Sequence, residues 1–133
     1  MLFGRMMDFQ TQGKRNRRAG LDFERKVRMQ LEEEGWIVNK HSNNIDLINN
    51  RFVPAKSNRF GMRQGGFPDF MIIRSASWLK GRPHFLVKFV ECKKGKYLNG
   101  EEKDKMRWLT SRGFECFVAY DNERKVEFRK FVE

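Results

Sequence analysis

Apolar residues recur at helical spacing between residues 21 and 31 of this chain of 133 residues. Leu21, Phe23, Val27 and Leu31 form a stripe along one face of such a helix. Gly35 follows the polar run LEEE and is typical of a helix C-cap. The pattern therefore predicts a helix that begins at Leu21, ends just before Gly35 and buries one face.

Glu24 falls inside this apolar stripe. At about 100° per residue, Glu24 and Leu31 lie only about 20° apart around the helix axis. Two explanations fit a carboxylate in this position. It suits the positive end of the helix dipole if it lies in the first turn, or it reaches a metal ion from the buried face. The sequence leaves both explanations open.

Runs of apolar residues with the alternation of β-strands follow this helix. Residues 42–66, rich in Asn, Arg, Gly and Ser, show no period and predict a long loop. The segment SASWLKGRP, residues 75–83, predicts a turn between two of the strands. The expected strands are residues 36–41, 67–74, 84–94, 114–121 and 125–132.

A second helix is predicted for residues 99–113, with acidic residues in its first turn, Arg112 in its last turn and Gly113 as its C-cap. The element order is then helix, strand, loop, two strands, helix and two strands. This order predicts an α/β fold in which helices flank a mixed sheet.

Basic residues outnumber acidic residues by 28 to 17, which gives a net charge of +11. A polyanionic partner is therefore the leading expectation, and the alternative is a basic protein that binds no polyanion. Residues 1–20 contain GKRNRRAG and no hydrophobic period, so they predict a flexible basic arm before a single domain of residues 21–133. Side chains that could neutralise phosphates, or could simply be solvated, are Lys14, Arg15, Arg17, Arg18, Lys56, Arg59, Arg63, Lys94 and Lys96.

Cys92 and Cys116 lack the C-x-x-C spacing of a zinc site and are expected to be buried free thiols of a reducing compartment. No apolar stretch approaches the roughly 18 to 20 residues that span a bilayer. The opening residues MLFGRMMDF are too short and interrupted for a signal peptide. We therefore expect a cytoplasmic protein without a membrane partner, whether it associates with a nucleoid or is encoded by a virus.

Three charged residues interrupt the predicted buried strands. Asp69 begins one apolar run, and Glu91 and Lys93 share one face at the end of the next because side chains alternate along a strand. A hairpin would place Asp69 beside Glu91. Two adjacent carboxylates can hold Mg²⁺, and a neighbouring lysine can orient or deprotonate a water or offset charge on a phosphate. The alternative is a structural ion pair, or simple exposure at the strand ends.

The runs GFPDFMII and FVECKKGK resemble the motif of the PD-(D/E)XK nuclease superfamily. The continuation LNGEEKDKMRWLTSRGFECFVAYD is similar to the virus-type replication-repair nuclease branch, in which a Gly-x-Pro-Asp strand precedes an E-x-K strand, a helix and a final strand. This resemblance covers residues 61–121. The segment RAGLDFERKVRMQLEEEGWIV instead resembles archaeal Holliday-junction resolvases, in which a glutamate of the first helix joins the metal site. The branch stays open.

The resemblance implies a restriction-endonuclease-like fold, with a mixed central β-sheet flanked by helices. It also implies a Mg²⁺-dependent endodeoxyribonuclease, in which Mn²⁺ can replace Mg²⁺. Asp69, Glu91 and Lys93 would then be catalytic. The metal ligands would be Glu24, Asp69, Glu91 and the carbonyl of Cys92.

The expected substrate is branched or otherwise structured DNA, such as a Holliday junction in repair or recombination. Paired cutting of a junction predicts a homodimer, which places two sites in fixed register. The chain departs from the virus-type pattern at Glu102, near a position where that branch often has Gln, and the role of Glu102 stays open. One alternative is a catalytically silent nucleic-acid-binding protein on the same fold. Another is an RNA-processing or virus-encoded DNA-replication accessory factor, which differs only in its partner.

Overall fold

The computed structural model describes residues 2–56, 65–79 and 81–132, with side chains described for residues 15–56, 65–76 and 81–132. Its elements alternate between helices and strands much as the apolar pattern predicts, and the α/β class with a mixed sheet is confirmed. In chain order they are α1 (Leu2–Glu33), β1 (Ile37–Lys40), β2 (Asn43–Asp46), β3 (Arg51–Pro54), β4 (Phe70–Leu79), β5 (Arg82–Lys93), α2 (Gly100–Thr110), β6 (Glu115–Asn122) and β7 (Lys125–Lys130).

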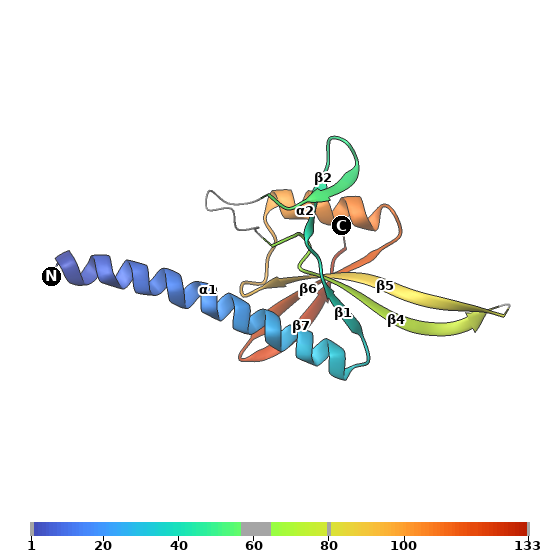
Figure 1. Cartoon of the computed structure of the whole chain (residues 1–133), viewed down its shortest axis with the longest axis horizontal. Helices are drawn as coiled ribbons and strands as arrows, with labels where there is room; N and C mark the ends of the chain where they lie inside the picture. The colour runs from blue at the N-terminus through green and yellow to red at the C-terminus, as the bar shows by residue number, and fades with distance from the viewer. Residues whose placement is uncertain (1, 57–64, 80, 133) are drawn as a thin grey trace.

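The main sheet has the strand order β1-β4-β5-β6-β7. Strands β5 and β6 run parallel, joined through α2, and the other neighbours are antiparallel. Figure 1 shows α1 on one side of this sheet, with α2 and the separate β2–β3 hairpin on the other. The pairing of Phe70 with Val90 sets the register that brings the start of β4 to the end of β5.

Two hydrophobic cores lie on the two faces of the sheet. Phe23, Val27 and Leu31 of α1 pack in the first core, where Val27 is fully buried. Met106 and Leu109 of α2 pack in the second. Successive residues of β5 alternate between the cores, with Phe89 facing α2 and Val90 facing α1, as the period of two requires.

Helix α1 is longer than the pattern predicts. It begins at Leu2, so the predicted start at Leu21 is wrong, and the expected arm of residues 1–20 is helical over its described part. The mobility of that arm stays a prediction. Leu21 is also 57% exposed, outside the buried stripe. The predicted C-cap is confirmed: Gly35 has a φ of 92°, and the amides of Gly35 and Trp36 donate to the carbonyls of Glu32 and Leu31.

The predicted loop of residues 42–66 is wrong in part, because it contains the β2–β3 hairpin. Asp46 organises the turn of that hairpin by accepting hydrogen bonds from the amides of Ile48 and Asn49. The turn predicted for residues 75–83 is confirmed as the connection of an antiparallel hairpin, but its extent is wrong, because β4 continues to Leu79 and β5 begins at Arg82. Arg112 lies beyond the end of α2, whose N-terminus carries a capping box between Asn99 and Glu102.

Candidate active site

Asp69 and Glu91 lie side by side where β4 begins and β5 ends. The amide of Asp69 donates to Oε1 of Glu91 over 3.0 Å. The amide of Cys92 donates to Oδ2 of Asp69 over 2.8 Å. Each carboxylate is therefore fixed by a backbone group of the opposite strand, and the hairpin predicted from the sequence brings the pair together as expected.

Both carboxylates are largely removed from water. Glu91 is only 6% exposed, and the Asp69 side chain is 14% exposed. Burial, together with the negative charge of Asp69 and a hydrogen bond to it, raises the pKa of Glu91 to about 10. Burial and the same carboxylates also raise the pKa of the Cys92 thiol. Two buried carboxylates in contact are unfavourable unless a proton or a cation offsets their charge.

Lys93 lies next to this pair, two residues after Glu91 on the same face of β5. Its Nζ is 3.8 Å from Oε2 of Glu91 and forms a closer ion pair with Glu102 of α2. Burial alone would lower the pKa of Lys93, but the hydrogen bond with Glu102 and the surrounding carboxylates raise it. Lys93 is therefore a fixed positive charge, which suits it to offset charge on a phosphate better than to remove a proton from water.

Glu102 is the residue that holds Lys93 in place. It lies at the third position of α2, where its side chain also accepts the amide of Asn99. Burial opposes its ionisation, but the hydrogen bond from Lys93 lowers its pKa. The capping position of Glu102 thus couples the start of α2 to the E-x-K strand, a role that the sequence left open.

Lys40 is a site residue that sequence reasoning missed. Its Nζ lies 3.0 Å from Oε2 of Glu24 and 3.6 Å from Oδ1 of Asp69. The alternation in β1 puts Lys40 on the same face as buried Val38, and this is the one sequence signal that could have indicated it. Burial alone would lower the pKa of Lys40, but Glu24 and Asp69 raise it.

Glu24 reaches the site through Lys40. Because α1 begins at Leu2, Glu24 does not lie in its first turn, and the helix-dipole explanation is wrong. The Glu24 side chain is 27% exposed and pairs with Lys40, which also contacts Asp69. Its direct contact with a metal ion stays a prediction.

The donor set of the site suits a hard cation. Within the described residues no group of three or more His, Cys, Asp or Glu side chains forms a metal cluster. Mg²⁺ needs fewer protein ligands than that, because it retains several waters and is commonly held by one or two carboxylates. Asp69 and Glu91 supply those two carboxylates. The Cys92 side chain packs against the core beneath α1, and its backbone amide contacts Asp69, whereas ligation of a metal by its carbonyl stays a prediction.

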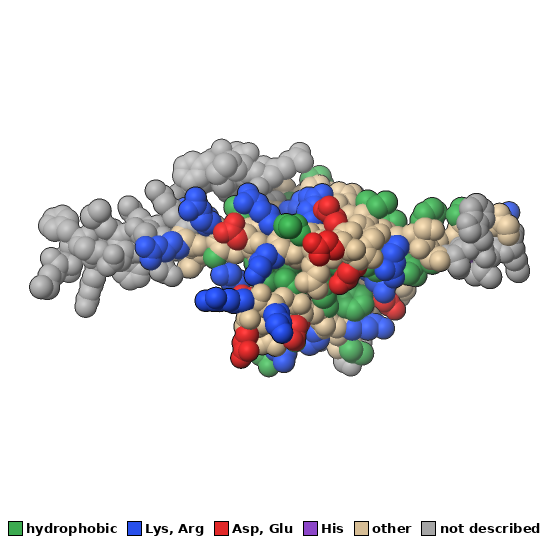
Figure 2. Space-filling model, turned by 90° about the horizontal axis from the view of Figure 1, so that it is seen from below, with side chains coloured by type: hydrophobic (Ala, Val, Ile, Leu, Met, Phe, Trp, Pro, Cys, Tyr) green, Lys and Arg blue, Asp and Glu red, His purple; other side chains and the backbone are tan. Residues whose placement is uncertain are grey.

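The predicted phosphate-binding residues are spread over the surface. Figure 2 shows Lys and Arg side chains along the described part of α1, with acidic side chains among them. Lys96 lies 5.6 Å from the ring centre of Tyr120. Arg59, Arg63 and the side chain of Lys14 fall outside the described residues. The exposed residues of the predicted set are Arg15, Arg17, Arg18, Lys56, Lys94 and Lys96.

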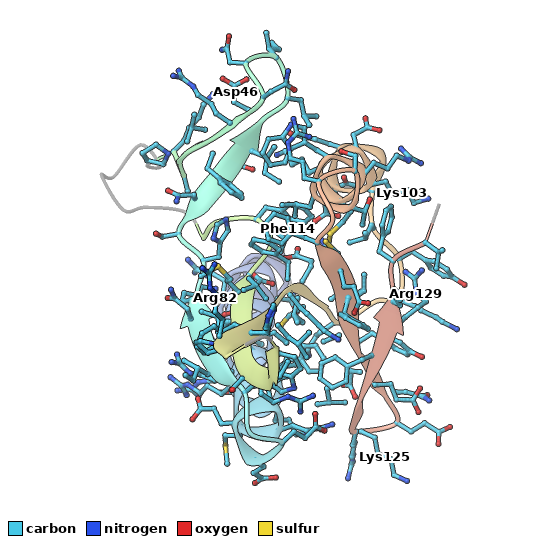
Figure 3. The ribbon with its side chains drawn as sticks, turned by 90° about the vertical axis from the view of Figure 1, so that its right-hand side faces the viewer. Asp46, Arg82, Lys103, Phe114, Lys125 and Arg129 are labelled. Atoms are coloured by element: carbon cyan, nitrogen blue, oxygen red, sulfur yellow. The ribbon has the colours of Figure 1, made fainter. Side chains whose placement is uncertain are left out.

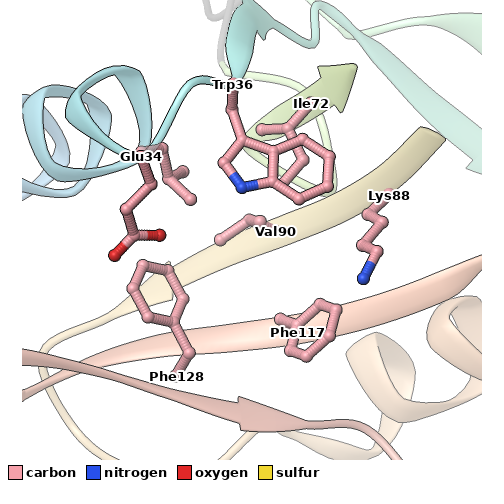
Figure 4. A pocket seen from close by; sticks show the side chains of 8 residues that line it. Glu34, Trp36, Ile72, Lys88, Val90, Phe117 and Phe128 are labelled. Atoms are coloured by element: carbon pink, nitrogen blue, oxygen red, sulfur yellow. The ribbon is translucent and has the colours of Figure 1, made fainter. Parts of the chain in front are cut away.

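A cavity of about 200 Å³ lies elsewhere, against the face of the sheet that α1 covers. Figure 4 shows Trp36, Ile72, Val90, Phe117 and Phe128 around it, with Glu34 and Lys88 at its sides. None of the carboxylates of the site lines this cavity, so it is not where the charged chemistry would occur.

Comparisons with protein-family models, curated proteins and solved structures find no match to this chain. The resemblance to PD-(D/E)XK nucleases therefore rests on the motifs quoted above, and any function must be argued from the geometry of the site. In the described part of the chain, no helix is both long and apolar enough to cross a membrane.

Proposed function

We propose that this chain is a Mg²⁺-dependent endodeoxyribonuclease with a restriction-endonuclease-like fold. The observation that carries the proposal is the contact of Asp69 with Glu91, two largely buried carboxylates fixed by backbone amides, with the ammonium group of Lys93 beside them. A structural ion pair needs one carboxylate, whereas this arrangement brings two together, at a cost in stability unless a proton or a cation offsets one of the charges. Such a cost is expected where a cation completes the site.

Asp69 and Glu91 would hold Mg²⁺, with Mn²⁺ as a substitute. When bound, the ion supplies an activated water and polarises the phosphate. Lys93 stays charged and offsets the negative charge that develops on the phosphate in the transition state. Glu102 keeps Lys93 oriented through their ion pair.

The alternative, a silent nucleic-acid-binding protein, leaves the acidic pair unexplained. A surface that only binds phosphate gains nothing from carboxylates that repel it, and the net charge of +11 already supplies attraction. We extend the proposal to branched or structured DNA cut by a homodimer in repair or recombination, because a two-fold dimer would place two sites in fixed register for paired cutting.

A cleavage panel tests this function. Labelled duplex, single strand, flap, splayed arm and four-way junction are incubated with Mg²⁺, Mn²⁺ or EDTA. Asp69→Asn and Glu91→Gln should each abolish cleavage while DNA binding stays intact or tightens, since each removes negative charge near phosphate. Lys93→Ala should lower the rate by about 10²-fold or more.

Asp104→Asn is the matched control, because this carboxylate on α2 is 60% exposed and pairs only with Arg107 of its own helix among the contacts described. It should cleave at the wild-type rate. If the wild type cuts no substrate with either metal, the silent alternative replaces the nuclease. Cleavage retained in Asp69→Asn and Glu91→Gln would remove the pair from the active site.

A further inference from the structure

The outer parts of β4 and β5 form a two-stranded ribbon that leaves the body of the protein. Pairing of β4 with β1 reaches only as far as Ile73, and pairing of β5 with β6 starts only at Lys88. Residues 74–79 and 82–87, which we call the β4–β5 ribbon, therefore pair with each other alone. Figure 1 shows the ribbon extending well away from the other strands and from both helices.

An uncovered ribbon of this length is unfavourable by itself, because isolated two-stranded hairpins are marginally stable in water. Its described side chains include apolar groups that no layer covers: Phe85 is 60% exposed and Leu86 is 37% exposed. The ribbon is therefore better explained as a surface that a partner completes than as part of the core.

The charge of the ribbon indicates the partner. Between Asp69 and Glu91 the sequence contains no acidic residue and four basic ones. Of these, the Arg74 guanidinium stacks on Trp36, with Cζ 4.3 Å from the ring centre. Nζ of Lys88 forms an ion pair with Oε2 of Glu115 over 2.9 Å. Both side chains therefore already contact residues outside the ribbon. Arg82 is exposed, and its side chain forms no ion pair, hydrogen bond or ring contact with the residues that the structure describes. Figure 3 looks along the ribbon and shows Arg82 at its near end.

On β5, one face of the ribbon carries the exposed polar residues Arg82 and His84 together with Leu86. Side chains alternate along β5, so Arg82 and His84 point to the opposite face from Phe85. Both residues are exposed. A ribbon with a basic face and no acidic residue is complementary to a polyanion. Two such ribbons would repel each other, which argues against pairing of the ribbon with its own copy.

We propose that the β4–β5 ribbon binds duplex DNA at a distance of about one helical turn from the cleaved bond. A two-stranded β-ribbon is narrow enough to enter the major groove. Glu91 lies nine positions after Arg82 along β5, which corresponds to about 30 Å of strand at roughly 3.3 Å per residue. This length matches about nine base pairs, close to the 10 to 10.5 base pairs of one turn.

The position of the cleaved bond rests on the proposed function, but binding of the ribbon to duplex does not. The experiment therefore measures binding in EDTA, where no cleavage occurs. Fluorescence anisotropy records the affinity of the full chain for duplexes of 6, 10, 14 and 18 base pairs over a range of salt concentrations.

Wild-type affinity should rise steeply up to about one turn of duplex and then level off. Arg82→Ala should bind duplexes of 14 and 18 base pairs roughly fivefold to tenfold more weakly at 0.1 M salt, with a salt slope smaller by about 0.9. Arg82→Lys, which keeps the charge, should bind like the wild type. Lys125→Ala is the matched control, since Lys125 is an exposed cation in the β6–β7 hairpin, away from the ribbon.

Equal losses for Arg82→Ala and Lys125→Ala would overturn the proposal, because the ribbon would then contribute only to the general positive field. Unchanged DNA binding of Arg82→Ala would overturn it too, and a simultaneous shift from dimer to monomer in sedimentation would make the ribbon a contact between copies. Loss of binding in Arg82→Ala with no cleavage by the wild type would refute the nuclease and leave the ribbon as a duplex-binding element.

Discussion

Glu91 makes the metal-free protein less stable as the pH rises. Its folded-state pKa of about 10 lies above the ordinary value of 4.5, first because of burial and then because of Asp69. Between these values the folded chain keeps a proton that the unfolded chain has released, so the free energy of unfolding falls as pH increases. One such proton contributes a slope of up to about 1.4 kcal/mol per pH unit.

Glu91→Gln removes this titration and keeps an oxygen that can accept the amide of Asp69. Between pH 6 and pH 8 the free energy of unfolding of the wild type should therefore fall, relative to the variant, by about 2 to 3 kcal/mol. Lys93 at 3.8 Å favours the charged form of Glu91 and acts to reduce this difference. We expect the variant to be the more stable protein at pH 8 in EDTA.

Urea unfolding followed by tryptophan fluorescence at pH 6, 7 and 8 in EDTA measures this difference. Glu115→Gln is the control, because the hydrogen bond from Lys88 lowers the pKa of Glu115. A lowered pKa contributes stability above the ordinary value that is lost only at acid pH, so this variant should differ from the wild type by a constant amount from pH 6 to pH 8. If the free energies of unfolding of the wild type and Glu91→Gln changed with pH in parallel, Glu91 would be ionised in the folded protein at neutral pH. That result would refute the prediction.

Three further substitutions test the surroundings of the pair. Lys40→Met should bind Mn²⁺ several-fold more tightly in titration calorimetry, because it removes a cation 3.6 Å from Oδ1 of Asp69; weaker binding would show instead that Lys40 supports the site. Glu102→Gln should lower kcat with little change in KM, because Lys93 loses the charge that orients it; an unchanged kcat would leave this ion pair structural. Asn99→Ala should lower the free energy of unfolding by about 1 kcal/mol through loss of the capping box, and an unchanged urea midpoint would contradict that role.

The sequence predicted the parts of the site that depend on local geometry. The alternation of β5 placed Glu91 and Lys93 on one face, and a hairpin was enough to bring Asp69 beside Glu91. Both relations follow from the period of a strand and from antiparallel pairing, which operate over short sequence distances. The same reasoning predicted the C-cap at Gly35, where a positive φ favours glycine.

Elements that do not follow a local hydrophobic period were predicted poorly. The first half of α1 extends away from the sheet in Figure 1, and residues 10–18 contain no apolar side chain that would mark a helix, although Arg, Gln and Lys are good helix formers. The β2–β3 hairpin packs against residues outside it. The centre of the Phe52 ring lies 5.2 Å from the centre of the His41 ring and 5.5 Å from that of Trp108. Such contacts across the fold leave no periodic signal in residues 42–66.

Lys40 was missed for a related reason, since a lysine at the end of a short strand is ordinarily a solvated residue. Its role emerges only from the charges that tertiary packing collects around the Asp69–Glu91 pair. Lys40 joins the pair to α1, and Lys93 joins it to α2.

Four carboxylates then face two ammonium groups, which leaves a formal charge of −2 when all are ionised: Glu24, Asp69, Glu91 and Glu102 against Lys40 and Lys93. A divalent cation neutralises that charge, whereas protonation of Glu91 offsets only half of it. Lys40 and Lys93 therefore reduce the repulsion between the carboxylates of the metal-free site without neutralising their charge. This residual negative charge is the physical basis on which we expect Mg²⁺ to bind.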